Sequence, residues 1–235
     1  MRRIASRAGR LARHITVAAA LAGAGAPVAH AQAIGITHVD TLAAQRLPAL
    51  PNATHELRFT AYNFRGTRWT NAAIEEALIS SASLLGQCGV AVVHAELRLI
   101  DAPRRFHYYH TPESRELLRW IDAPRPALFF VEDTKNDPAF DAEAIGLANS
   151  KPRPELVNTV WVAYGARDLP YAIAHELVHL LSNSGEHSRE AGNLMRTETA
   201  RGNDKLTDAQ CERLRTRGEA NGLLTRATSA VPRRD

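Results

Sequence analysis

The feature that most constrains this chain is the segment DLPYAIAHELVHLL at residues 168–181. Its apolar residues recur at the spacing of an amphipathic helix, and Pro170 is typical of a first helical turn. At 100° per residue, His175 and His179 stack on one face with Glu176 beside them, while the leucines gather on the far side. The apolar face must pack against another layer, and the polar face is therefore expected to line a cleft.

Strand and helix patterns alternate along the rest of the chain. Apolar runs and alternations predict strands, and apolar stripes bounded by caps and glycines predict helices. The expected strands are residues 55–64, 89–100, 126–133 and 158–165 with a weak one at 144–148, and the helical stretches are residues 70–89, 111–121, 168–181 and 207–218. The alternation indicates an α/β or α+β domain. We expect α/β, with a mixed, mostly parallel sheet packed against the histidine-bearing helix and a C-terminal helix.

The predicted domain occupies residues 54–220. Residues 32–53 show no regular pattern and contain two prolines near their end, so an N-terminal arm or linker is expected there. Residues 221–235 are expected to form a flexible tail. Residues 32–235 together, about 200 residues, suit one domain with extended ends.

The first 31 residues have the layout of a secretory signal peptide. Five arginines without an acidic residue precede an alanine-rich apolar run, and Ala29-His30-Ala31 supplies the small-x-small pattern of a cleavage site. An N-terminal membrane anchor is the alternative. The apolar run, residues 15–29, is short for a span of about 20 residues and contains glycine and proline. Cleavage after Ala31 is favoured, which predicts a secreted or periplasmic protein with no membrane segment after cleavage.

The basic charge of the chain belongs mainly to this leader. The whole chain has 29 basic and 25 acidic residues. Removing the five leader arginines leaves 24 basic and 25 acidic residues, a formal charge of −1. The basic total is therefore no evidence for a nucleic-acid partner, and none is expected.

Two cysteines follow the leader, Cys88 and Cys211. In an exported protein such a pair favours one disulfide, with two buried thiols as the alternative. A disulfide here would close a long loop, which the chain-entropy description values at about 4 kcal/mol.

The H-E-x-x-H pattern at residues 175–179 is typical of a zinc site. Two imidazoles hold the ion, and the carboxylate beside them can polarise a water molecule without being a ligand. The third ligand is expected to be His187, just past Gly185, whose left-handed conformation could end the helix and turn the chain back. Glu186 and Glu190 are rivals because zinc also accepts carboxylate. The alternative is a buried helix whose histidines are incidental.

A second pair of histidines lies in RRFHYYH, residues 104–110. His107 and His110 could form another metal site, but no carboxylate or cysteine partner is evident nearby. Packing, or a loop bordering the cleft, is the favoured interpretation.

The segment from His175 onward resembles the active-site helix and turn of the metzincin clan of zinc metallopeptidases. That clan has two helical histidines with a glutamate after the first, then a glycine, a third histidine, and a later turn that carries a methionine. The matching residues here are His175, Glu176, His179, Gly185, His187 and Met195. The order of strands and helices is similar over about residues 55–217.

The spacing departs from that of the clan in two places. Ser182 and Gly185 stand where the clan has its glycine and its third histidine, so the helix is expected to run further before it turns. Arg196 follows Met195, where some branches of the clan place a tyrosine that contributes to the transition state.

The resemblance implies an exported, zinc-dependent peptide hydrolase acting on a peptide or protein substrate. Glu176 would be the general base, and Met195 a structural floor under the histidines. The weak strand at residues 144–148 would pair with an extended substrate. The alternative from another class is an exported zinc-binding adaptor or peptide-binding module without catalysis. A structural zinc site is a third, in which Glu186 or Glu190 closes the fourth position.

Overall fold

The computed structural model describes residues 34–227 of the 235-residue chain. The expected signal peptide, residues 1–31, and the last eight residues of the expected tail lie outside this part. Among the described residues, no helix combines the length and apolar character needed to cross a bilayer.

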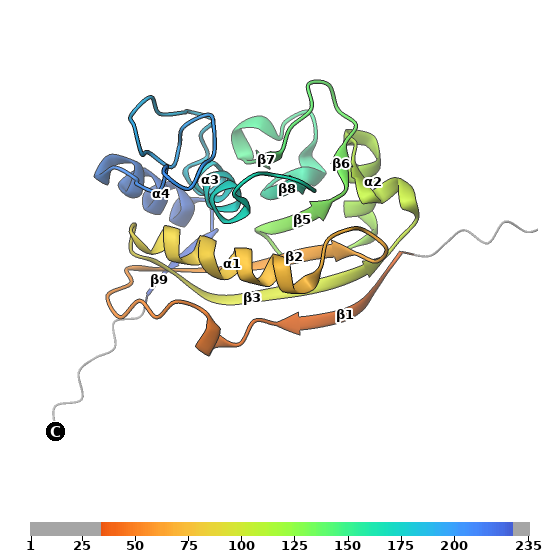
Figure 1. Cartoon of the computed structure of the whole chain (residues 1–235), viewed down its shortest axis with the longest axis horizontal. Coiled ribbons are helices and arrows are strands. Elements are labelled where there is room, and N and C mark those ends of the chain that lie inside the picture. Colours follow the sequence, from red (N-terminus) through yellow and green to blue (C-terminus); the bar gives the residue numbers. More distant parts are fainter. Residues whose placement is uncertain (1–33, 228–235) are drawn as a thin grey trace, which may run out of the picture. The chain divides into compact units, whose positions relative to one another are not determined.

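A seven-stranded mixed sheet forms the centre of the domain (Figure 1). Its order is β1 (Gly35–Thr41), β3 (Val90–Asp101), β2 (His55–Phe64), β5 (Ala127–Val131), β8 (Thr159–Ala163) and β7 (Ala142–Ile145), and β9 (Leu224–Arg226) also pairs with β2. The four central strands β3, β2, β5 and β8 run parallel, whereas β1, β7 and β9 are antiparallel to their neighbours. The predicted α/β class with a mixed, mostly parallel sheet is confirmed. Two short strands, β4 (Tyr108–Tyr109) and β6 (Asp133–Thr134), form a separate parallel pair.

Four α-helices accompany the sheet: α1 (Asn71–Gly86), α2 (Thr111–Trp120), α3 (Leu169–Ser182) and α4 (Asp208–Ala220). Because strand side chains alternate between faces, β2 contributes to two cores. Leu57 and Phe59 pack with α1, α3 and α4 in the larger core, and Tyr62 and Phe64 join the smaller core on the other face, which includes Leu117 of α2.

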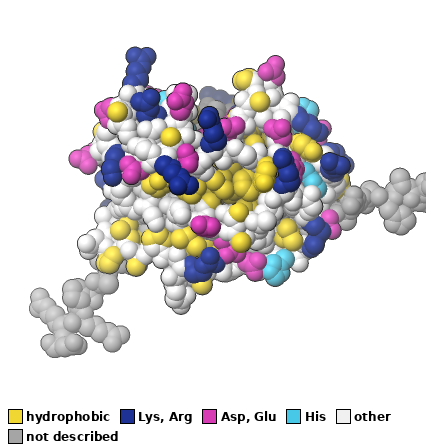
Figure 2. Space-filling view, in the orientation of Figure 1, with side chains coloured by type: hydrophobic (Ala, Val, Ile, Leu, Met, Phe, Trp, Pro, Cys, Tyr) yellow, Lys and Arg dark blue, Asp and Glu magenta, His cyan; other side chains and the backbone are white. Residues whose placement is uncertain are grey.

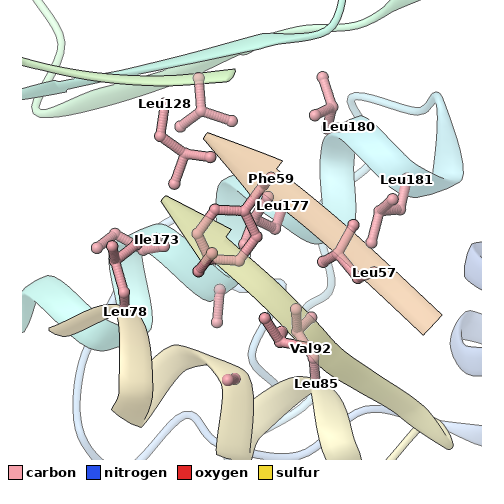
Figure 3. Packing of buried hydrophobic residues seen from close by; sticks show 14 of the residues in the cluster. Leu57, Phe59, Leu78, Leu85, Val92, Leu128, Ile173, Leu177, Leu180 and Leu181 are labelled. Atoms are coloured by element: carbon pink, nitrogen blue, oxygen red, sulfur yellow. The ribbon is translucent and has the colours of Figure 1, made fainter. Parts of the chain in front are cut away.

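The larger core holds the helix that carries the histidines. Ile173, Leu177 and Leu181 of α3 are fully buried. In Figure 3, Leu177 and Leu181 lie beside Phe59 and Leu57 of β2, and Ile173 lies beside Leu78 of α1. Burying a side chain of this size stabilises a fold by about 1.5–3 kcal/mol. The apolar face expected from the sequence is therefore the face that fixes α3, and its polar face is left for the cleft.

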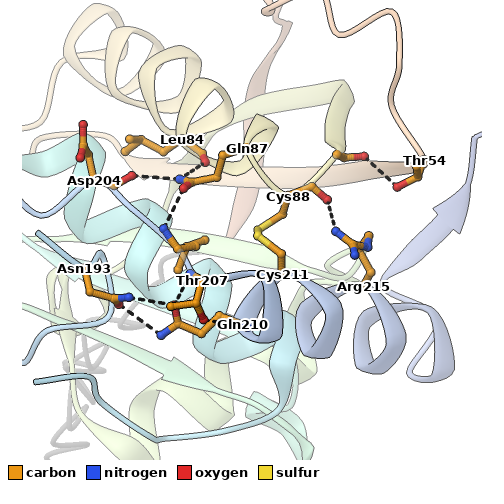
Figure 4. Close-up of a disulfide and its surroundings, with 12 residues drawn as sticks. Thr54, Leu84, Gln87, Cys88, Asn193, Asp204, Thr207, Gln210, Cys211 and Arg215 are labelled. Carbon is orange, nitrogen blue, oxygen red and sulfur yellow. Dashed lines mark hydrogen bonds between the residues drawn. A yellow bond between two sulfur atoms is a disulfide. The ribbon is translucent and has the colours of Figure 1, made fainter. Parts of the chain in front are cut away.

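Cys88, just after α1, is joined by a disulfide to Cys211 in α4, across a sequence separation of 123 residues (Figure 4). The pairing expected from the sequence is present. It ties the two helices that flank α3 in the larger core.

Charged side chains of both signs are interspersed on the face drawn in Figure 2. Exposed ion pairs occur in the structure, for example Arg105 with Glu116 at 2.7 Å. Such pairs are worth only about 0–1 kcal/mol each. The two apolar cores, rather than these charges, therefore account for most of the stability.

The structure corrects the expected N-terminal arm and C-terminal tail. Residues 35–41 form the edge strand β1, which pairs with β3 along its length. Most β1 side chains are exposed, so the strand is held by backbone hydrogen bonds and has no apolar pattern to reveal it. Residues 224–226 form β9, in which only Leu224 is buried. Three residues are too short for a periodic signal.

Candidate metal centre

Helix α3 presents His175, Glu176 and His179 on the face away from the larger core. Two positions four apart stack along a helix, so the two imidazoles lie one above the other, with ring centroids 4.5 Å apart. His175 is only 3% exposed and Glu176 only 8%. The helix therefore places two imidazoles and one carboxylate at the edge of a largely dry environment.

Backbone carbonyls fix which nitrogen of each helical histidine carries a proton. Nδ1 of His175 lies 2.8 Å from the carbonyl of Leu194, and Nδ1 of His179 lies 2.7 Å from that of Ser184. A carbonyl can only accept a hydrogen bond, so each Nδ1 must donate. In the neutral ring, each Nε2 then keeps a free lone pair.

The two free Nε2 atoms face each other at 2.9 Å. Burial lowers the pKa of both rings; for His179, burial together with the neighbouring His175 lowers the pKa to about 4. Both imidazoles are therefore neutral at pH 7, and no proton lies between the two lone pairs. A cation between the nitrogens satisfies both of them, which is the chemistry of a metal site.

His187 completes the group from the loop that follows α3. Its Nε2 lies 3.3 Å from Nε2 of His179, and its ring is exposed. Next to it, Ser188 N donates to the carbonyl of Met195 at 2.7 Å, which closes the loop onto the later turn. Ligand atoms of His175, His179 and His187 all lie within 4.8 Å of one another, close enough to bind one metal ion.

The turn that brings His187 back differs from the expected one. Helix α3 ends at Ser182, so the expectation that it runs further is wrong. Asn183, with φ 49°, takes the left-handed conformation assigned to Gly185, which is not left-handed. Asn is the residue after glycine that most readily adopts this conformation. Its Oδ1 also accepts from Ala148 N at 2.8 Å, which ties the helix end to the 3-10 turn at Leu147–Asn149.

The two carboxylate rivals to His187 are not members of the group. Glu186 is exposed and forms an ion pair with Arg213 of α4. Glu190 is exposed, and its backbone N–H donates to Ser188 Oγ at 3.2 Å. Within residues 34–227, the set of three or more close metal-ligating side chains consists of the three histidines.

Glu176 lies in the same cleft, which has a volume of about 760 Å³. Burial raises the pKa of its carboxyl group to about 8, against a backbone hydrogen bond from Ala144 that lowers it. This is a carboxyl whose pKa has been moved into the range useful for proton transfer near neutral pH.

Strand β7 borders the cleft and is an edge of the sheet. It covers residues 142–145, so the expected strand at 144–148 begins earlier, and residues 147–149 form a 3-10 turn instead. Asp141 directs its carbonyl to β8, where it accepts from Ala163 N at 2.8 Å. Because backbone groups alternate in an antiparallel pair, Ala142 and Ala144 direct theirs to the open edge.

The second pair of histidines does not form a metal site. His107 is buried and its Nε2 contacts the carbonyl of Ala102 at 3.3 Å. His110 pairs through Nδ1 with Glu113, three residues later. Packing therefore describes His107, whereas His110 is partly exposed and has a carboxylate partner, Glu113, that was not expected from the sequence.

Met195 is buried in the larger core, at the end of a turn that begins at Gly192 with φ 75°.

No family model matches the chain, and no curated protein is similar to it in sequence. The geometry of the site therefore carries the functional interpretation.

The sequence did not reveal the groups that orient the histidines. The carbonyls of Leu194 and Ser184 are backbone atoms, which leave no mark on residue type. Asn183 and Asn193 give only a weak sequence signal for turns, since Asn is common in left-handed and turn positions. The pattern Thr207-x-x-Gln210 is a capping-box signature, and the structure has that box at the start of α4.

Proposed function

We propose that this chain is a zinc-dependent peptide hydrolase in which Glu176 is the general base. The observation that carries the proposal is the pair of bare Nε2 atoms of His175 and His179, which face each other beside a buried carboxylate in one cleft. The third imidazole, His187, borders the same space.

The donor set fits zinc. Three neutral imidazoles and an open fourth position are typical of catalytic zinc, whereas structural zinc has four protein ligands. At the usual Zn–N distance, tetrahedral ligand atoms lie roughly 3.3 Å apart. The Nε2 separations of 2.9 Å and 3.3 Å are near that value. Among the described residues no fourth protein ligand joins the three histidines.

When bound, zinc supplies a Lewis acid that polarises the scissile carbonyl and the attacking water. Glu176 takes the proton from that water and passes it to the leaving nitrogen. Its burial excludes bulk water from the carboxylate. A nearby cation favours the ionised carboxylate, so the pKa of about 8 in the metal-free protein falls when the site is loaded.

An extended peptide is the substrate that this cleft accommodates. The open edge of β7 can add one more strand, as sheet edges do in peptide recognition. The Ala144 N–H already serves Glu176, and its carbonyl accepts from Asn149 Nδ2 at 3.2 Å. We therefore assign the free backbone groups of Ala142 to the substrate.

We infer that the mature protein acts outside the cytoplasm. The layout of residues 1–31 supports export, and the Cys88–Cys211 disulfide is of a kind that persists in oxidising compartments. N-terminal sequencing of the protein from the envelope or the medium should start at Gln32. Recovery only in the cytoplasm with Met1 or Arg2 as first residue would contradict export.

The test of hydrolysis is a peptide-library cleavage assay with residues 32–235 loaded with one equivalent of zinc. Glu176→Gln is the matched control, since it keeps the shape of the side chain but cannot accept the proton. We expect cleavage by the wild type, and about 10²–10⁴-fold slower turnover in the variant at unchanged zinc content. Equal turnover in the variant would refute the role of Glu176. Zinc binding without any cleavage would favour the adaptor or peptide-binding alternative.

A further inference from the structure

The side-chain carboxamides of Asn193 and Gln210 face each other (Figure 4). They join the methionine turn, residues 192–195, to α4. Asn193 is 2% exposed, and its Nδ2 donates to Gln210 Oε1 at 2.9 Å. In return, Gln210 Nε2 donates to Asn193 Oδ1 at 3.2 Å. The same Oδ1 accepts from Met195 N at 2.9 Å, so the side chain of Asn193 spans the turn and closes it.

Gln210 is itself held in one orientation by the cap of α4. Its Oε1 accepts from Thr207 N at 2.8 Å, and its own N–H donates to Thr207 Oγ1 at 3.2 Å. A rotation of the carboxamide would break the cap as well as the contact with Asn193. Because α4 is also joined to α1 through Cys211, Gln210 presents a fixed donor and acceptor to the turn.

The paired carboxamides of Asn193 and Gln210 form a clamp on the turn. Leu194 follows Asn193 in this turn, and its carbonyl accepts the Nδ1 proton of His175. Leu194 N donates to the carbonyl of Lys205 at 2.7 Å, and Lys205 N donates to that of Gly192 at 3.0 Å. The Lys205 backbone holds Leu194 on one side of the turn, and the Asn193 side chain closes the turn on the other side. Together they fix the direction of the Leu194 carbonyl.

That direction decides which nitrogen of His175 is available to a metal. The carbonyl keeps the proton on Nδ1 and leaves Nε2 bare toward His179. Partners of this kind outside the ligand set orient metal-bound histidines, and their loss costs about 10–100-fold in metal affinity.

We propose that Gln210 is a positioning residue for the metal centre: through Asn193 it fixes the Leu194 carbonyl that orients His175. The inference rests on the proposed metal centre and not on peptide hydrolysis. It differs from a helix-capping role alone, since a cap stabilises α4 without altering the affinity of the histidines for metal.

Asn136 offers a matched control. It is also a carboxamide that joins a loop to the start of a helix: Oδ1 accepts from Thr111 N at 3.3 Å, and Nδ2 donates to Thr111 Oγ1 at 3.0 Å, at the first residue of α2. Neither bond involves residues 192–195 or Lys205, which pairs with them. Truncating Asn136 therefore removes comparable hydrogen bonds without loosening the support of Leu194.

The experiment measures the zinc Kd by chelator competition, together with the d–d spectrum of the cobalt-loaded protein, for residues 32–235. We expect Gln210→Ala to raise the Kd about tenfold and to change the cobalt spectrum. Asn136→Ala should stay within about twofold of the wild type. Gln210→Glu keeps both accepted hydrogen bonds, so its Kd should lie between the wild type and Gln210→Ala.

The possible outcomes distinguish the positioning role of Gln210 from the metal centre itself. A wild-type Kd and spectrum in Gln210→Ala would overturn the positioning role and leave the metal centre intact. An equal rise in Asn136→Ala would overturn it too, since general loosening would then suffice. No zinc binding by the wild type would remove the metal centre and this inference together. If Gln210→Ala does not fold, Gln210→Met, of similar length but without the carboxamide, carries the same prediction.

Discussion

The two histidine groups of this protein contain the same side chain in opposite circumstances. In the first, His175 and His179 give their Nδ1 protons to carbonyls, and their Nε2 lone pairs converge with that of His187. In the second, His107 contacts a carbonyl through Nε2 and His110 pairs with Glu113. The first group has unused lone pairs that share one space, and the second has none that converge.

The difference shows that the spacing of histidines matters less than what holds their outer nitrogens. A rigid helix supplies two positions four apart, and the carbonyls of Leu194 and Ser184 set both rings to face inward. His107 ends a 3-10 turn and His110 is the N-cap of α2, so the two rings stand on different elements.

The largest expected effect is on metal binding. His175→Ala or His179→Ala should weaken zinc affinity by at least about a thousandfold, because losing a ligand costs more than losing an outer partner. His107→Gln is the control in the second group, and its zinc Kd should equal that of the wild type. The measurement is chelator competition at pH 7.5. A similar loss in His107→Gln would break the contrast.

The next effect concerns the carboxyl of the first group in the metal-free protein. The pKa of Glu176 is raised from 4.5 to about 8, so the folded state binds this proton more tightly than the unfolded state. Its contribution to stability is complete below pH 4.5 and is lost as the pH rises to about 8. Glu176→Gln removes this loss.

The advantage of Glu176→Gln over the wild type should therefore grow between pH 4.5 and about pH 8, by roughly 1.4 kcal/mol for each pH unit. Urea denaturation of both metal-free proteins across this range measures it. His179 titrates alike in the two proteins, so its contribution cancels. Parallel stability curves would show that Glu176 is not buried as described.

A smaller effect is expected from removing the disulfide, because α4 supports the first histidine group and not the second. Replacing Cys88 and Cys211 by serine should lower the free energy of unfolding by about 2–4 kcal/mol. Hydrogen exchange should quicken at residues 188–195, which α4 supports, and stay unchanged at residues 104–110. Mass-resolved exchange of the variant against the wild type measures both. Equal quickening in the two segments would show that α4 does not support the first group selectively.

The smallest effect is confined to the second group. His107→Gln should lower the free energy of unfolding by about 1 kcal/mol, the net worth of a hydrogen bond. Peptide turnover should not change. Thermal denaturation and the cleavage assay together check this. A loss of turnover without a loss of stability would assign His107 a part in the site.

Much of the fold could be predicted because burial imposes a period on the sequence. The limits of β2 at residues 55–64 were predicted as the structure has them, since its side chains face two cores. Helix α3 was recognisable from the same physics. Strands β1 and β9 were not, because backbone pairing holds them and most of their side chains are exposed.

The candidate site could be predicted in its residue types but not in its support. The sequence was sufficient to group His175, His179 and His187 and to place Glu176 beside them. It misassigned the turn to Gly185, because the left-handed role of Asn183 depends on where α3 stops. The clamp between Asn193 and Gln210 joins positions 17 residues apart and was visible only in three dimensions.

The three-histidine metal centre can be tested by elemental analysis of purified residues 32–235 beside the His187→Ala variant. A three-histidine centre predicts about one zinc per chain in the wild type and a large loss in the variant under the same dialysis. Full retention of zinc by His187→Ala would contradict the third ligand, and a wild-type protein without zinc would contradict the metal centre itself.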